Sequence, residues 1–158
     1  MLALLFYISD VKYIIKCEKI REIAPVVVLK TVPHAPDYFA GYFNYRGEIV
    51  PVIDLCRLIQ GTPCRARLSS RIILVDYRAR GGASYILGVM AEQVTETIKK
   101  PGDAFQKPGI RSKEAPYLGG IVMDNGEMIQ YIDLNFLPNC IQFLPAGEDG
   151  ESDDPMEY

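Results

Sequence analysis

Short apolar runs rich in β-branched and aromatic residues recur along the chain, and polar or turn-forming residues separate them. Runs of roughly four to eight such residues between turn signals are typical of β-strands. The segments that fit this pattern are 2–8, 11–16, 26–31, 42–45, 48–53, 71–77, 84–91, 94–98, 121–124 and 127–132. Helical patterning is limited to 17–23, 36–40, 54–60 and 135–143. We therefore expect an all-β fold with a few short helices.

Three dipeptides between these segments predict hairpin turns. They are Ser9-Asp10, Arg46-Gly47 and Asn125-Gly126. Asn-Gly is the strongest of these signals because both residues tolerate the positive φ that a two-residue hairpin turn needs. Residues 99–114, by contrast, are polar and contain Pro101 and Pro108, so we expect them to form an exposed loop.

The strand segments fall into two groups of five, each connected mostly by short turns. Such groups predict two small barrels rather than one sandwich. We expect one domain over residues 1–146, with a first barrel at about 12–69 and a second at about 70–137. The N-terminal strand can be shared between them. Residues 147–158 carry six acids and no base, so we expect an acidic disordered tail with too little apolar surface to fold.

The composition places the chain among ordinary soluble domains. A chain of 158 residues that is 49% hydrophobic and 23% charged can bury a core of its own. The apolar start at 1–8 is far shorter than the roughly 20 residues of a spanning helix, and it lacks a basic leader. We therefore expect a cytoplasmic protein without direct membrane insertion.

Candidate catalytic and metal-binding residues are sparse. The cysteines are Cys17, Cys56, Cys64 and Cys140, with no C-x-x-C pair, and the one histidine is His34. A zinc site needs four closely placed ligands, so we expect free thiols and no metal. Asp54 and Glu48 have no partner spaced with them into a catalytic set. We expect Asp54 to cap a helix at 55–60 instead, and we predict no enzymatic activity and no cofactor.

The most specific pattern lies at 41–55, where two apolar runs meet at Arg46-Gly47. This stretch resembles the signature of the CheW family, the adaptors that couple bacterial chemoreceptors to a CheA-type histidine kinase. The signature contains a glycine, apolar residues, Asn-Leu-Arg-Gly, and later a Pro and an Asp-Leu within apolar residues. The matching residues are Gly41, Asn44, Arg46, Gly47, Pro51, Asp54 and Leu55, with Tyr45 at the usual aliphatic position. Segments on both sides extend the resemblance over roughly residues 1–137.

The resemblance implies a fold of two intertwined five-stranded SH3-like β-barrels around a shared interior, with a groove between them. It also implies a non-enzymatic adaptor with two partners. These are the regulatory domain of a CheA-type histidine kinase and the cytoplasmic tip of a methyl-accepting chemoreceptor. The expected location is the cytoplasm, at receptor arrays on the inner face of the membrane.

A partner-binding site follows from the same resemblance, and its candidate residues are Ile20, Glu22, Gly41, Asn44, Arg46 and Gly47. Glu22 and Arg46 match the family's Val-x-Glu-Ile glutamate and Asn-Leu-Arg-Gly arginine, and we expect them to form an exposed ion pair. A guanidinium at a turn suits a carboxylate or the carbonyl groups at a helix end. Asn44 can serve either the turn or a partner. The two glycines are expected to act through the backbone shapes that they permit.

Two further interpretations concern the class of protein. Basic residues between Arg57 and Lys113 could line a nucleic-acid surface on small barrels, but the isoelectric point of about 5.2 and the lack of an aromatic-plus-basic motif argue against this alternative. Within the family, the aromatic residues Tyr42, Phe43 and Tyr45 and the acidic tail resemble auxiliary CheW-like proteins of surface-sensing or motility pathways.

Overall fold

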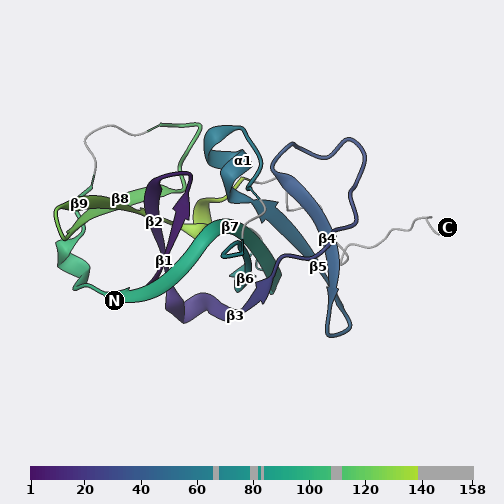
Figure 1. Cartoon of the computed structure of the whole chain (residues 1–158), viewed down its shortest axis with the longest axis horizontal. Coiled ribbons are helices and arrows are strands. Elements are labelled where there is room, and N and C mark those ends of the chain that lie inside the picture. The colour runs from purple at the N-terminus through teal and green to yellow at the C-terminus, as the bar shows by residue number, and fades with distance from the viewer. Residues whose placement is uncertain (66–67, 79–81, 83, 108–111, 139–158) are drawn as a thin grey trace.

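The computed structural model describes residues 1–65, 68–78, 82, 84–107 and 112–138 (Figure 1). The predicted tail at 147–158 and the end of the predicted helix at 135–143 lie outside the described residues. The strands are β1 (Leu2–Ile8), β2 (Val11–Lys16), β3 (Ile20–Pro25), β4 (Phe39–Tyr45), β5 (Glu48–Asp54), β6 (Arg71–Arg78), β7 (Ser84–Lys99), β8 (Leu118–Asp124) and β9 (Glu127–Ile132). The helices are α1 (Leu55–Gln60) and the 3-10 turns η1 (Cys17–Lys19), η2 (Gly102–Ala104) and η3 (Leu134–Phe136). The predicted strand-dominated fold class is confirmed.

The three predicted hairpins are present, and local turn chemistry explains them. Strands β1 and β2, β4 and β5, and β8 and β9 pair antiparallel across their turns. Both central residues of the second and third turns have positive φ, at 53° and 90° for Arg46 and Gly47 and at 51° and 81° for Asn125 and Gly126. This geometry is that of a type I′ turn, whose twist matches the twist of the paired strands.

Strand β7 joins two five-stranded groups. Its first half pairs with β6 from Arg78↔Ser84 to Arg71↔Ala91, and its second half pairs with β1 from Tyr7↔Glu92 to Leu2↔Lys99. One group therefore consists of β3, β6, β7, β5 and β4, and the other of β7, β1, β2, β9 and β8. Figure 1 shows the second group at one end of the molecule and β4 and β5 at the other. The predicted barrel boundary between residues 69 and 70 runs through the first group.

One long strand replaces the two strands predicted at 84–91 and 94–98. Gln93, with φ 45°, lies close to the point where β7 changes partner. This left-handed residue bends the strand without ending its pairing, so the break in the apolar pattern between 91 and 94 marks a bend and not the end of a strand.

The region from 17 to 31 differs from the prediction. The sequence predicts a helix at 17–23, but the short turn η1 is followed directly by β3. The sequence also predicts a strand at 26–31, but the backbone after β3 is irregular except for an isolated bridge from Lys30 to Tyr42. Strand β3 alternates half-buried and exposed residues and pairs with β6, some fifty residues later in the chain. The valines that follow have high strand propensity, but among the described residues no strand pairs with them, and Val28 is 96% exposed.

A short helix predicted at 36–40 is a turn instead. The Phe39 amide donates to the Pro36 carbonyl at 3.0 Å, and β4 begins at Phe39. The Asp54 amide donates to the Tyr38 carbonyl at 2.8 Å, so this turn is attached to the end of β5.

Three apolar clusters form the core. The largest contains Phe6, Ile15, Ile73, Leu87 and Val89 among others, and it draws on strands of both groups. Smaller clusters lie within the first group, around Val52 and Leu74, and within the second group, around Leu5 and Ile129. Successive residues of β1 and β6 face different clusters, so both strands are buried on two sides. Their almost continuously apolar sequences follow from this position.

Helix α1 begins where the sequence predicted. The Asp54 carboxylate accepts from the Arg57 amide at 3.0 Å, which confirms the predicted N-cap, and Gly61 ends the helix with φ 84°. Among the described residues, no helix is both long and apolar enough to cross a membrane.

The expectation of free thiols is wrong for two of the four cysteines. Cys56 in α1 and Cys64 after it form a disulfide with a Cα–Cα distance of 5.0 Å. Gly61 turns the chain back under the helix, which brings together two residues that no sequence motif connects. Cys17 is a free thiol, and Cys140 lies outside the described residues.

Candidate partner-binding site

The turn between β4 and β5 presents Arg46 to solvent in a defined backbone conformation. The Gly47 amide donates to the Asn44 side-chain oxygen at 2.8 Å, and this bond closes the turn. Gly47 has open space where a Cβ would stand, so its positive φ is what the turn requires. Asn44 therefore has a structural role at the base of the turn.

Arg46 and Glu22 form the predicted ion pair. The Arg46 Nη2 atom lies 3.1 Å from the Glu22 Oε1 atom, and the two side chains are 74% and 38% exposed. Glu22 belongs to β3 and Arg46 to the β4–β5 turn, so the pair connects two elements that are not adjacent strands. An exposed pair contributes only about 0–1 kcal/mol to stability, and its main effect is to orient the guanidinium.

Tyr45 is a third member of this site that the sequence does not place among the candidate partner-binding residues. Its hydroxyl donates to the same Oε1 atom of Glu22, and the Arg46 guanidinium lies 5.1 Å from the centre of its ring. The Glu22 carboxylate thus accepts a hydrogen bond from a phenol and pairs with a guanidinium, and these two groups also contact each other. A tyrosine directly before the signature arginine was the available sequence signal.

The hydrogen bond to Glu22, together with desolvation, raises the pKa of the Tyr45 phenol. We expect Glu22→Ala to lower this pKa toward the usual value of about 10. The check is an alkaline NMR titration of a chain with labelled tyrosine rings. Glu48→Ala is a suitable control, because Glu48 is an exposed carboxylate directly opposite Tyr45 in β5 but is not among the groups that shift the pKa of the phenol. An unchanged Tyr45 titration in Glu22→Ala would contradict the contact.

Gly41 and Ile20 have positions that differ from those of the other four candidates. Gly41 lies within β4 with φ 135°, and a Cβ there would be 2.5 Å from the Lys30 carbonyl oxygen. Ile20 begins β3, is half-buried and packs against the largest apolar cluster. The structure therefore groups Glu22, Asn44, Arg46 and Gly47 at one turn and places Gly41 and Ile20 where they shape the backbone and the core.

A polar groove of about 510 Å³ begins beside this turn. Its lining includes Arg21, Glu48 and Asp76, and an ion pair of 2.8 Å joins Arg21 to Asp76. We refer to Glu22, Asn44, Tyr45 and Arg46 as the Arg46 surface. It combines an oriented cation, a carboxylate and an aromatic ring, which suits recognition of another protein.

Comparison with known proteins gives a consistent result. The family model for the CheW-like domain matches residues 2–139. The "Probable chemotaxis protein CheW" of Rhizobium etli is 27% identical over 134 residues, which are 84% of this chain and 83% of that protein. Protein FrzA of Myxococcus xanthus is 26% identical over 83% of this chain and 79% of its own length. The crystal structure of the scaffolding protein TtCheW from Thermoanaerobacter tengcongensis superposes with a TM-score of 0.74 at 26% identity, over 85% of each chain.

Proposed function

This chain belongs to the CheW-like family, and from that premise we propose that it is a chemotaxis-type adaptor that couples a chemoreceptor to a CheA-type histidine kinase. We infer that the adaptor is not itself an enzyme and that it acts in the cytoplasm, at receptor arrays on the inner face of the membrane. Its partners are the regulatory domain of the kinase and the cytoplasmic tip of the receptor.

The observation that carries the proposal is the ion pair between Glu22 and Arg46 at an exposed hairpin turn. The carboxylate and the Tyr45 ring hold the guanidinium in place while most of the Arg46 side chain stays accessible. A planar guanidinium held in this way can donate to a carboxylate or to the terminal carbonyl groups of a partner helix.

An adaptor of this kind transmits a signal by differential contact. A receptor can change the output of a kinase through a bridging protein only if the contacts of the bridge differ between the signalling states. Orientation of Arg46 by Glu22 and Tyr45 favours affinity for such a partner, because a side chain that is already oriented loses less conformational entropy on binding.

The alternative of a nucleic-acid-binding protein receives no support from the comparisons. Two of the basic residues that suggested it are engaged with acids: Arg65 with Glu92 and Lys100 with Asp124. A basic side chain that is paired with a carboxylate is less available to phosphate groups.

A double-mutant cycle tests the role of the ion pair. We expect Arg46→Ala and Glu22→Ala each to weaken binding to the kinase regulatory domain or to the receptor tip by about tenfold. The unfolding midpoint should change little, because the pair is exposed. The double variant should bind about as well as either single variant, which would show coupling. Affinity is measured by titration calorimetry, with urea denaturation as the stability check.

The matched control is Lys12→Ala, which removes an ion pair with Glu127 on the other five-stranded group. This variant should bind both partners with unchanged affinity. Full affinity of Arg46→Ala for both partners would refute the assignment of the site. Independent, additive effects of the two substitutions would refute the coupling of Glu22 to Arg46.

A further inference from the structure

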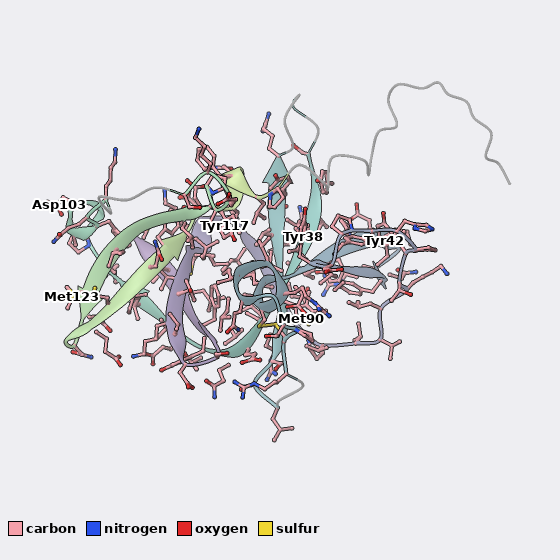
Figure 2. All side chains as sticks on the ribbon, turned by 90° about the horizontal axis from the view of Figure 1, so that it is seen from above. Tyr38, Tyr42, Met90, Asp103, Tyr117 and Met123 are labelled. Atoms are coloured by element: carbon pink, nitrogen blue, oxygen red, sulfur yellow. A yellow bond between two sulfur atoms is a disulfide. The ribbon has the colours of Figure 1, made fainter. Side chains whose placement is uncertain are left out.

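A disulfide joins two cysteines that are eight residues apart, one in α1 and one in the segment after it. Cys56 is the second residue of the helix and is fully buried, whereas Cys64 follows the helix and is half-buried. Their Cα–Cα distance of 5.0 Å lies within the range that disulfides occupy, roughly 4.4–6.8 Å. Figure 2 shows the sulfur–sulfur bond beside Met90.

The surroundings of Cys64 suit both redox states. Asp54 Oδ1 lies 3.0 Å and the Met90 carbonyl oxygen 3.6 Å from the Cys64 Sγ atom. A disulfide sulfur carries no proton, so it donates to neither oxygen, but a Cys64 thiol can donate to either one. Asp54 also accepts from the Cys64 amide at 3.1 Å, a hydrogen bond that requires no proton on either sulfur and so is compatible with both redox states.

A metal ion is a weaker interpretation of the same side chains. Ligand atoms of Asp54, Cys56 and Cys64 lie within 4.8 Å of one another. Structural zinc sites take four ligands, and no fourth acidic, histidine or cysteine ligand joins this group among the described residues. Both carboxylate oxygens of Asp54 already accept from backbone amides, those of Arg57 and Cys64.

We propose that Cys56 and Cys64 form a reversible redox modification site that is oxidised by low-molecular-weight disulfides and reduced by the corresponding thiols. Because Cys64 is the accessible partner, its thiolate attacks the external disulfide first. The external sulfur–sulfur bond breaks, a mixed disulfide forms on Cys64, and one small thiolate leaves. The Cys56 thiolate then attacks the Cys64 sulfur and expels the second small thiolate. The two protons of the protein thiols go to the leaving thiolates, so two protein thiols and one external disulfide give one protein disulfide and two external thiols.

The redox state of Cys56 and Cys64 controls how firmly the next residue, Arg65, is held against Glu92. The Arg65 amide donates to Glu92 at 2.6 Å, and its guanidinium lies 3.3 Å from the same carboxylate. Glu92 is buried in β7 and also accepts from the Ser9 amide of the β1–β2 turn. In the oxidised chain, a covalent bond one residue away holds Arg65 against this carboxylate. In the reduced chain, hydrogen bonds alone hold it.

Differential alkylation of the full chain tests the redox chemistry. The chain is incubated with oxidised or reduced glutathione, denatured and alkylated, and its cysteine peptides are identified by mass spectrometry. We expect Cys56 and Cys64 to be unlabelled after oxidation and labelled after reduction, with full recovery of the disulfide on reoxidation. Cys17, which is free, should be found as a labelled thiol or as a mixed disulfide with glutathione, and not joined to Cys56 or Cys64, so it serves as the internal control.

Amide hydrogen exchange tests the consequence for Arg65. Exchange at the amides of Cys64 and Arg65 should become about tenfold faster on reduction. Cys64→Ser should reproduce the fast exchange under oxidising conditions, and Cys17→Ser should not. Labelling of both cysteines in either buffer, or of neither in both, would overturn the reversible site. Exchange rates that do not depend on redox state would overturn the control of Arg65, and tight binding of added Zn²⁺ by the reduced chain would favour a metal site instead.

Discussion

Replacing Gly41 with alanine is expected to destabilise the chain by about 3–5 kcal/mol. Gly41 has φ 135°, a conformation that side-chain-bearing residues rarely adopt. A Cβ at this position would lie 2.5 Å from the oxygen and 3.0 Å from the carbon of the Lys30 carbonyl group. That carbonyl is backbone, so it cannot rotate away as a flexible side chain could.

The contact matters because it attaches the irregular segment after β3 to β4. The Lys30 amide donates to the Tyr42 carbonyl at 2.8 Å, and the Tyr42 amide donates to the Lys30 carbonyl at 2.9 Å. Moving Lys30 to make room for a methyl group would break or lengthen both bonds. The irregular segment after β3 would then lose these two backbone hydrogen bonds to β4, the first strand of the hairpin that carries Arg46.

Urea denaturation with two matched glycine variants separates the causes. Gly61→Ala has a positive φ of 84° but open space around the new methyl group, so it should cost only about 1 kcal/mol. Gly102→Ala has open space and no positive φ, and it should be nearly neutral. If Gly41→Ala is no more destabilising than Gly61→Ala, the steric contact with Lys30 is unimportant.

Replacing Glu92 with leucine is the second change with a large expected effect, a loss of about 2–4 kcal/mol. The Glu92 carboxylate accepts from the amides of Ser9 and Arg65, and its side chain is only 3% exposed. Leucine fills a similar volume but leaves both amides without this acceptor. Glu92→Gln keeps one acceptor oxygen and should lose less.

The stability contributed by Glu92 should depend on pH. Burial by itself would raise the pKa of Glu92, but the hydrogen bonds from Arg65 and Ser9 and the charge of Arg65 lower it below the usual value. The folded chain therefore holds this proton less tightly than the unfolded chain does. The contribution of Glu92 is fully present above the unfolded pKa of about 4.3, and it is lost as the pH falls through the lower folded value.

We expect the difference in unfolding free energy between the natural chain and Glu92→Gln to shrink as the pH falls from about 6 to about 3. Urea midpoints at several pH values measure it. The control is Glu96→Gln, which changes an exposed carboxylate on the same strand. A difference that stays constant over this range would show that the ionised carboxylate contributes nothing special.

Where local chemistry decides the structure, the sequence predicts it closely. The predicted strands at 2–8, 11–16 and 127–132 have the observed bounds of β1, β2 and β9. Their ends are set by turn residues that are adjacent in the chain, such as Asn125 and Gly126. Asp54 as a helix cap is equally local, because its hydrogen bond reaches a residue three positions later.

The prediction was wrong in the region 17–31, where a distant strand, β6, decides which of two neighbouring segments forms a strand. Val26, Val27 and Val28 have higher strand propensity than β3 has, yet β3 forms because β6 supplies an edge with which it can pair. Propensity alone cannot show which of two neighbouring runs meets that edge.

The candidate site divides in the same way. The pairing of Glu22 with Arg46 was predicted from the resemblance to a family, and Asn44 and Gly47 were predicted at the turn. The contact of Tyr45 with Glu22 depends on how closely β3 approaches the β4–β5 hairpin, a distance that spacing along the chain does not determine.

The sequence by itself thus determined the strand-rich class, the three hairpin turns, the capped helix and the family signature, because each depends on residues close together in the chain. Tertiary structure alone decided that β7 serves both strand groups, that Cys56 and Cys64 are bonded, and that Glu92 binds Arg65 and the β1–β2 turn. The first and third of these features join segments that packing of the shared apolar cluster brings together, and the disulfide depends on the path of the chain after α1. The pattern of apolar and polar residues encodes neither locally.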